Sequence, residues 1–226
     1  GSLDVRVTST AEVTVRLDGR PVPLGTTDVG PVDPWSAESP RLYELVVSTA
    51  SETVTCRVGF RRIEISDGLL RINGSPMRFR GVNRHDTDAD HGRTVTREQV
   101  RADLLAMKRA HLNAVRTSHY PPLPYLLDVA DEIGLYVLEE GDIETHAFVL
   151  DEWRNNPSDD PSWTEAYVDR TARMVRRDRH HASVVMWSLG NEAGAGRNFL
   201  EARDWLLRED PTRPIHYERD PSYAPS

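Results

Sequence analysis

The sequence contains very little cysteine, and it has no long apolar run. Cys56 is the single cysteine among 226 residues, which excludes a disulfide framework and favours a reducing compartment. We therefore predict a cytoplasmic location. No apolar stretch approaches the roughly 18 to 20 residues that a membrane helix needs, and no signal peptide is visible at the start of the chain.

Positive charge is also in deficit. The 28 basic residues are outnumbered by 36 acidic ones, which gives a net charge of −8 and argues against a general nucleic-acid surface. No glycine-rich phosphate loop follows a predicted strand, so nucleotide binding has no support. These absences predict an acidic globular protein that has neither a nucleic-acid partner nor a membrane partner.

Residues 1–65 have the pattern of short β-strands. Apolar and polar residues alternate over 13–17, the Asp18-Gly19 pair supplies a turn, and two further strands are expected over 42–47 and 54–58. Short strands with turns between them and no helical period are typical of an antiparallel sandwich. Because only about four strands are present, we predict part of an immunoglobulin-like β-sandwich over residues 1–65.

Residues 66–226 change to an alternation of strands and helices. Thr96 and Gln99 have the spacing of a capping box at the start of a helix, and Gly134 stops another helix. The alternation is typical of a doubly wound sheet or of a (β/α)8 barrel, and the helices do not separate the two. We expect the five strands at 78–82, 113–116, 135–138, 184–189 and 214–217.

Polar residues distinguish the two architectures, because they follow the expected strands where barrel enzymes keep their chemistry. One histidine in a loop is more often a hydrogen-bonding residue than a catalyst, but four polar clusters at successive strand ends favour an active site. We therefore predict the N-terminal part, about five strands, of a TIM barrel over residues 66–226. The four clusters lie at 83–86, 116–122, 139–146 and 188–194.

Glu144 and His146 form a candidate metal-ligand pair. If their segment is extended, side chains two residues apart point the same way, and a carboxylate and an imidazole converge. The alternative is a pair of exposed loop residues, and a third ligand such as Glu192 would decide between them. An oxygen-dominated site suits Mg²⁺, whereas Zn²⁺ prefers more histidine or cysteine.

Glu192 is the strongest candidate for a general acid. It follows a buried apolar strand, where desolvation can raise the pKa of a carboxyl group, and Asn191 beside it can hydrogen-bond a sugar hydroxyl. The alternative is a carboxylate near a helix N-terminus, because Gly194 and Gly196 precede the fourth helix.

Together these motifs resemble glycoside hydrolase family 2, most closely its large multidomain β-galactosidases. The resemblance runs from about residue 35 to the end of the chain. It rests on RGVNRH at 80–85, NAVRTSHYP at 113–121, IETH at 143–146 and DRHHASVVMWSLGNE at 178–192.

The resemblance implies a retaining enzyme of carbohydrate metabolism that hydrolyses terminal β-D-galactose residues of lactose-type galactosides. Glu192 would be the acid/base, and Glu144, His146 and Glu192 would be the protein ligands of a magnesium ion. The residues that would bind the sugar are Asn83, His85, Arg116, His119 and Asn191. The complete protein would be a homo-oligomer, and a sodium ion is possible, although its ligands cannot be assigned in this chain.

The resemblance also places the nucleophilic glutamate on a later barrel strand, so we expect the chain to be inactive alone. Glu140 is the best internal substitute, and its position in the family indicates a structural residue instead. The chain departs from many relatives at 86–89, where Asp-Thr-Asp-Ala replaces a His- and Pro-rich run. The alternatives are a β-glucuronidase of the same family and a non-catalytic sugar-binding or assembly fragment.

Overall fold

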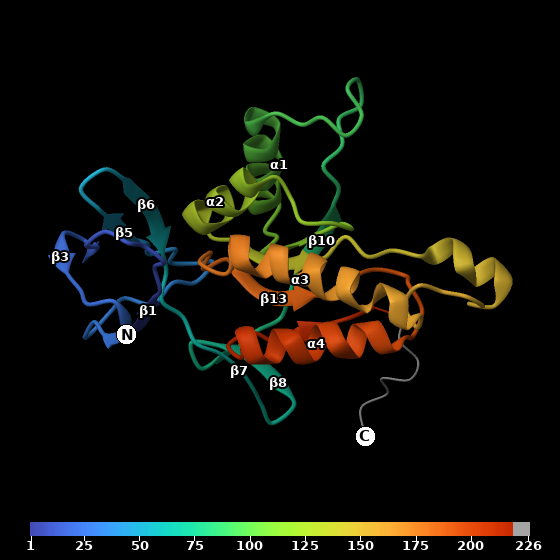
Figure 1. Ribbon diagram of the computed structural model, residues 1–226. Coiled ribbons are helices and arrows are strands. Elements are labelled where there is room, and N and C mark those ends of the chain that lie inside the picture. Colours follow the sequence, from blue (N-terminus) through green and yellow to red (C-terminus); the bar gives the residue numbers. More distant parts are fainter. Residues whose placement is uncertain (219–226) are drawn as a thin grey trace.

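The computed structural model describes residues 1–218, and its N-terminal part consists of antiparallel strands (Figure 1). Val15 and Leu17 of β2 are buried while the residues between and before them are exposed, as the alternation predicts. These side chains form a core with Val5, Leu45 and Val58. A four-stranded sheet has the order β3 (Arg20–Pro21), β2 (Thr14–Leu17), β5 (Tyr43–Ser48) and β6 (Thr53–Val58), and β1 (Ser2–Val5) pairs with β4 (Gly25–Asp28).

A small three-stranded sheet connects this part to the rest of the chain. It contains β7 (Ile63–Ser66), β8 (Leu69–Ile72) and β9 (Ser75–Pro76), all antiparallel. Ile72 is buried against Trp35 in the core beneath the second region, whereas Ile65 and Leu69 are exposed near the turn of the hairpin.

The second region contains five parallel strands in sequential order, which confirms the partial barrel. A doubly wound sheet reverses its strand order at a switch point, whereas a barrel keeps neighbouring strands consecutive. The strands are β10 (Gly81–Arg84), β11 (Ala114–Thr117), β12 (Tyr136–Glu140), β13 (Val184–Ser188) and β14 (Ile215–His216). The helices are α1 (Arg97–Arg109), α2 (Pro124–Ile133), α3 (Thr164–Asp178) and α4 (Arg197–Glu209).

The helix boundaries follow from local sequence signals. Thr96 and Gln99 form both hydrogen bonds of the capping box at the start of α1. Gly134 ends α2 in the left-handed conformation, and a Cβ there would lie 2.3 Å from the Ala37 carbonyl oxygen. No helix among residues 1–218 is both long and apolar enough to span a membrane.

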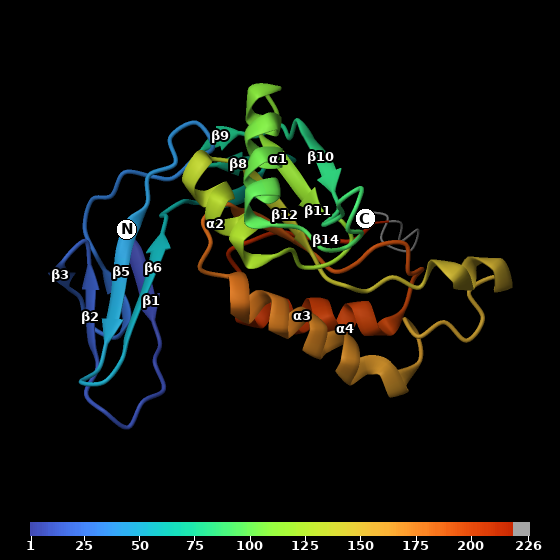
Figure 2. The same cartoon turned by 90° about the horizontal axis from the view of Figure 1, so that it is seen from above.

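The main core lies between the barrel strands and the helices. Val115, Val137 and Val184 of successive strands are completely buried against helical side chains such as Leu104 and Leu127. Figures 1 and 2 show α3 and α4 side by side along this layer, with a segment that includes η1 (His146–Asp151) extending away from the barrel. A second short helix, η2 (Pro161–Trp163), leads into α3.

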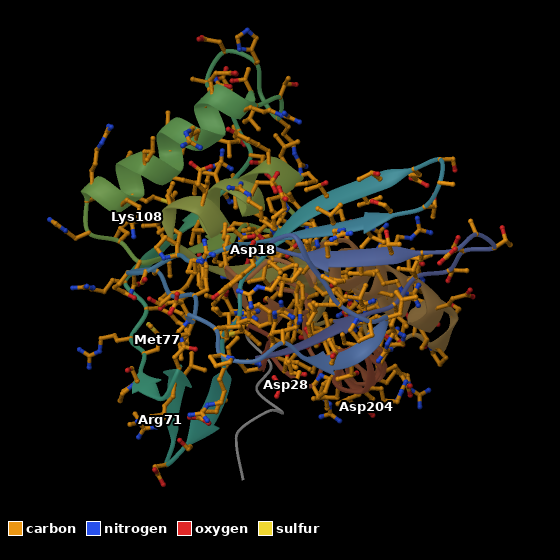
Figure 3. All side chains as sticks on the ribbon, turned by 90° about the vertical axis from the view of Figure 1, so that its left-hand side faces the viewer. Asp18, Asp28, Arg71, Met77, Lys108 and Asp204 are labelled. Carbon is orange, nitrogen blue, oxygen red and sulfur yellow. The ribbon has the colours of Figure 1, made fainter. Side chains whose placement is uncertain are left out.

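Trp35 and Lys108 are among the residues that attach the N-terminal part to the barrel. Trp35 is completely buried, its indole N–H donates to the Asp131 carbonyl oxygen at 2.9 Å, and its ring meets Tyr136 edge-on. Lys108, the single lysine of the chain and labelled in Figure 3, donates to the carbonyl oxygens of Ala37 and Gly134 at 2.9 and 2.7 Å. Its ammonium group therefore supplies a hydrogen-bond donor to the Gly134 carbonyl at the C-terminus of α2.

The first barrel strand begins later than the alternation predicts. We expected a strand over 78–82, but β10 spans residues 81–84. Asn113 provides the reason, because its side chain donates to the Arg78 carbonyl oxygen at 3.1 Å and accepts from the Arg80 N–H at 2.7 Å. This tertiary contact uses the backbone groups that a strand at residue 78 would need.

A buried pair of carboxyl groups, Glu139 of β12 and Asp178 of α3, lies between this strand and this helix. Glu139 is completely buried and lies 3.7 Å from Arg177 Nη2, whereas Asp178 accepts from Arg177 Nε at 2.8 and 2.9 Å. Burial raises the pKa of Glu139 well above its ordinary value, and the hydrogen bond and negative charge of Asp178 raise it further. The folded protein therefore keeps a proton on Glu139 up to a higher pH than the unfolded chain does.

Replacing Glu139 with Gln is expected to stabilise the protein at pH 8 and to change little near pH 5. The stability that the protonated carboxyl contributes is complete below its unfolded pKa of about 4.5 and is lost as the pH rises through the raised folded pKa. Each kcal/mol regained shifts the unfolding midpoint by roughly 2–4 °C. Calorimetry at both pH values, with the exposed Glu201→Gln as the control, measures the effect; an equal shift at the two pH values contradicts it.

Candidate active site

The carboxyl ends of neighbouring barrel strands bring polar side chains to one edge of the sheet. Asn83 of β10 is the register partner of Arg116 of β11, and Glu140 of β12 is the partner of Ser188 of β13. Register partners in a parallel sheet present their side chains on the same face. Sequential strand order therefore places residues that are distant in the sequence side by side.

Glu140 lies at the centre of this edge and is completely buried. Its Oε1 lies 2.6 Å from His119 Nδ1, and its Oε2 accepts from Arg116 Nε at 2.7 Å and from the Ser188 hydroxyl at 2.6 Å. The Glu140 backbone N–H donates to Thr117 Oγ1 at 2.9 Å. A buried carboxylate is tolerated only where charge and hydrogen bonds compensate its lost hydration, and these partners supply both.

Arg116 connects Glu140 to the next strand end. Its Nη1 donates to Glu218 at 2.6 Å, and its Nη2 donates to the side-chain oxygen of Asn191 at 3.0 Å. The amide nitrogen of Asn191 in turn donates to Glu144 at 3.2 Å. A continuous series of hydrogen bonds therefore links His119 to Glu144 through Glu140, Arg116 and Asn191. This series spans the carboxyl ends of β11, β12 and β13.

Two histidines lie at the outer side of this edge. His85 follows β10, and its ring meets the His119 ring edge-on with 5.2 Å between centroids. Tyr120 lies 6.2 Å from the His85 ring, and its hydroxyl accepts from the Asp86 N–H at 2.9 Å. The exposed His85 and the half-buried His119 thus present polar ring edges where a sugar could bind.

A backbone hydrogen bond joins the loop that follows β12 to the loop that follows β13. The Asn191 N–H donates to the Ile143 carbonyl oxygen at 2.9 Å, and Glu144 and Asn191 form an isolated parallel bridge. Gly190 permits this approach, because a Cβ there would lie 2.5 Å from the Ile143 carbonyl oxygen. The SLGNE motif therefore needs its glycine to place Glu192 beside Glu144.

Glu144, His146 and Glu192 converge into one cluster. One ligand atom from each residue lies within 4.8 Å of the others, and His146 Nδ1 is 2.7 Å from a Glu192 oxygen. His146 begins η1, so the bridge at Glu144 and a turn, rather than one extended strand, produce the convergence. Two carboxylates and one imidazole with exposed surface fit Mg²⁺, which prefers oxygen ligands and keeps several waters.

Glu192 occupies a backbone conformation that side chains rarely adopt. Its φ angle is 42°, in the left-handed region, which costs a residue with a Cβ of order 1 kcal/mol. Helix α4 begins at Arg197 with Gly196 as its N-cap, so Glu192 lies outside the first helical turn. The surroundings of Glu192 are therefore the Glu144 and His146 side chains rather than a helix N-terminus.

Aspartate side chains within the loop after β10 hold this loop in place. Asp86 pairs with the buried Arg84 and accepts from the Leu123 N–H at 3.0 Å. Asp88 accepts from the backbone N–H groups of Asp90 and His91 at 3.0 and 2.9 Å. These bonds fix the loop after β10 against the start of α2, where it positions His85.

Sequence reasoning missed His216 and Glu218 and gave Ser188 no role of its own within its cluster. Ser188 Oγ lies 3.0 Å from His216 Nδ1, and Glu218 pairs with Arg116. Burial lowers the pKa of His216, and the charge of Arg116 lowers it further. The available signal was Glu140 itself, because a charged residue inside a buried apolar strand is rarely found without partners.

Comparison with known proteins agrees with this arrangement. The TIM-barrel model of glycosyl hydrolases family 2 matches residues 63–225, and a second model of that family matches residues 3–61. The chain is 50% identical to a β-galactosidase of Arthrobacter sp. (strain B7) over 88% of its length, and 46% identical to one of Pectobacterium atrosepticum over 84%.

Solved structures of related enzymes share the fold. A β-D-glucuronidase of Dictyoglomus thermophilum is 26% identical, with a TM-score of 0.76 over 91% of this chain and 39% of that one. A β-galacturonidase of Eisenbergiella tayi bound to galacturonate is 25% identical, with a TM-score of 0.75 over 96% of this chain and 40% of that one. The chain covers only 20% and 19% of the two curated relatives. The chain belongs to glycosyl hydrolase family 2.

Proposed function

We propose that the chain is part of a retaining β-galactosidase that removes terminal β-D-galactose residues from lactose-type galactosides. The observation that carries this proposal is the unbroken set of hydrogen bonds from His119 through Glu140, Arg116 and Asn191 to Glu144, beside Glu192. These hydrogen bonds hold several proposed sugar-binding side chains in fixed positions next to the Glu192 carboxyl group. High identity to curated β-galactosidases supports this substrate over others in the family.

Glu192 serves as the acid/base in this proposal. A retaining glycosidase uses one carboxyl group as an acid and then a base, and a second one, about 5–5.5 Å away, as the nucleophile. Glu140 is unsuited to the second role, because His119, Arg116 and Ser188 already occupy its two oxygens. The resemblance to family 2 implies a nucleophile on a later barrel strand, and we place it outside residues 1–218.

The sugar is bound by the groups at the strand ends. Asn83, His85 and His119 line the outer side, and Asn191 keeps one donor and one acceptor position beyond its bonds to Arg116 and Glu144. Arg116 orients Asn191 and Glu140. In this arrangement, the side chains that meet sugar hydroxyls are held in place by partners behind them.

Glu144, His146 and Glu192 would hold a Mg²⁺ ion. When bound, the ion would supply positive charge beside the acid/base carboxyl group. Glu144 also accepts from Asn191, so the same residue couples the proposed metal ligands to the sugar-binding groups.

A neutral sugar is favoured over a uronic acid by the charges at this edge. Recognition of a uronate carboxylate calls for a cation, most often an arginine. Arg116 is already paired with Glu140 and Glu218, and Arg84 with Asp86 and Asp103. The glucuronidase and galacturonidase relatives are also less similar in sequence than the β-galactosidases.

The proposal is tested with three 4-nitrophenyl glycosides and the full-length protein. We expect kcat/KM for the β-galactoside to exceed that for the β-glucuronide and the β-galacturonide by about 100-fold or more, because mismatched polar groups in a built site are strongly rejected. Greater turnover of the glucuronide would favour the β-glucuronidase alternative. Binding of galactose without turnover of any glycoside would favour a non-catalytic module.

A further inference from the structure

We infer that Glu140 is a positioning residue that fixes the proton of His119 on Nδ1 and thereby presents Nε2 of that ring to the sugar. The inference rests on the proposed function for its consequence in catalysis. Its structural basis is the direction of the hydrogen bonds that Glu140 can accept.

An ionised carboxylate only accepts hydrogen bonds, so every partner of Glu140 has to donate. Arg116 donates in any case, since a guanidinium has no acceptor. The contact of 2.6 Å between His119 Nδ1 and Glu140 Oε1 therefore requires a proton on Nδ1. In the neutral imidazole the other nitrogen, Nε2, then carries a lone pair and accepts from a sugar hydroxyl.

The same rule extends to His216 through Ser188. The Ser188 hydroxyl donates its single proton to Glu140 at 2.6 Å, so its contact of 3.0 Å with His216 Nδ1 uses a serine lone pair. His216 therefore also carries its proton on Nδ1. One buried carboxylate thus determines the hydrogen-bonding direction of two histidines and one serine.

Full burial distinguishes this role from a simple surface pairing. Glu140 is completely shielded from solvent, so water cannot replace a lost partner, and an error in hydrogen-bond direction leaves a buried group unsatisfied. The neighbouring Glu139 is equally buried but faces Arg177 and Asp178 of α3. The two adjacent glutamates therefore offer a matched pair, one that contacts the site residues and one that lies on the other face of the strand.

Replacing Glu140 with Gln in the full-length protein tests the inference. An amide has one accepting oxygen and one donating nitrogen, so it cannot accept from both Arg116 and His119. We expect kcat/KM for the galactoside to fall by about 10- to 100-fold, the usual cost of losing a group that orients a site residue. The loss should appear mainly in kcat, measured below the unfolding midpoint of the variant, which the unsatisfied buried group lowers. Glu139→Gln should keep wild-type kcat/KM.

A double-mutant cycle separates positioning from general damage. If Glu140 acts through His119, Glu140→Gln should cost clearly less in a His119→Ala background than in the wild type. An equal cost in both backgrounds overturns the inference.

A second readout does not depend on activity. In protein labelled with ¹⁵N-histidine, His119 should show a protonated Nδ1 and an unprotonated Nε2, assigned by the signals that disappear in His119→Gln. Glu140→Gln should change this pattern, and Glu139→Gln should not. A protonated Nε2 in the wild type overturns the inference. If no galactoside is hydrolysed but the ¹⁵N pattern is as expected, the proposed function fails and the role of Glu140 stands.

Discussion

Replacing Glu192 with Gln is expected to lower kcat/KM for lactose about 10²- to 10⁴-fold in the full-length protein, the usual contribution of a general acid or base. Lactose has a poor leaving group, so cleavage of its glycosidic bond needs a proton from Glu192. Glutamine has the same shape but no proton to transfer. The initial rate of glucose release measures the effect.

Substrates with different leaving groups allow the acid role and the base role of Glu192 to be measured separately. A dinitrophenyl galactoside needs no acid to leave, so in the Glu192→Gln variant its first step should proceed while the base-assisted attack of water on the glycosyl-enzyme is slow. Added azide attacks without a base, and we expect it to restore turnover and to yield the β-galactosyl azide. The exposed Glu201→Gln on α4 serves as the control and should match the wild type with both substrates. Undiminished lactose hydrolysis by Glu192→Gln would show that Glu192 is not the acid/base.

Local signals predicted most of the fold. The capping box at Thr96 and Gln99 correctly placed the start of α1, and the alternation over 13–17 correctly identified β2 and its buried face. These features depend on neighbouring residues, which a sequence displays directly. The start of β10 could not be predicted in the same way, because the Asn113 side chain redirects the backbone at residues 78–80 from a distant position.

The candidate site likewise has features that the sequence predicts and features that depend on contacts between distant residues. Polar residues at strand ends were readable as a group, since sequential strands of a barrel end at one rim. The partners of Glu140 were not readable, because Arg116 lies 24 residues before it and Ser188 lies 48 residues after it. Only the strand register brings them together, and neither spacing nor composition encodes that register.

For the cluster of Glu144, His146 and Glu192, the sequence predicted the residues but not the backbone conformation that brings them together. Spacing suggested the first two residues, but the assumed extended strand is wrong at His146, which begins a short helix. The parallel bridge between Glu144 and Asn191 brings Glu192, the expected third ligand, beside the other two. The proposed metal site is assembled from two separate loops, so removing a ligand from either loop is expected to weaken metal binding strongly.

Replacing His146 with Ala is therefore expected to weaken divalent-cation binding by the full-length protein by about 100-fold or more. Losing even an outer partner of a metal site typically costs 10- to 100-fold in affinity, and His146 would be a direct ligand. Mn²⁺ serves as the probe, because it accepts the same oxygen and nitrogen ligands as Mg²⁺ and its binding is measured directly by electron paramagnetic resonance.

The control for this experiment lies in the same loop. Asp142 is exposed and pairs with Arg170 outside the cluster, so Asp142→Asn removes one negative charge near the site without removing a proposed ligand. We expect Asp142→Asn to bind Mn²⁺ as the wild type does, and Glu144→Gln to lose affinity as His146→Ala does. If His146→Ala and Glu144→Gln both retain wild-type affinity, the cation does not bind at this cluster. A loss in Asp142→Asn of the same size would instead indicate general attraction by the acidic surface rather than ligation by three specific side chains.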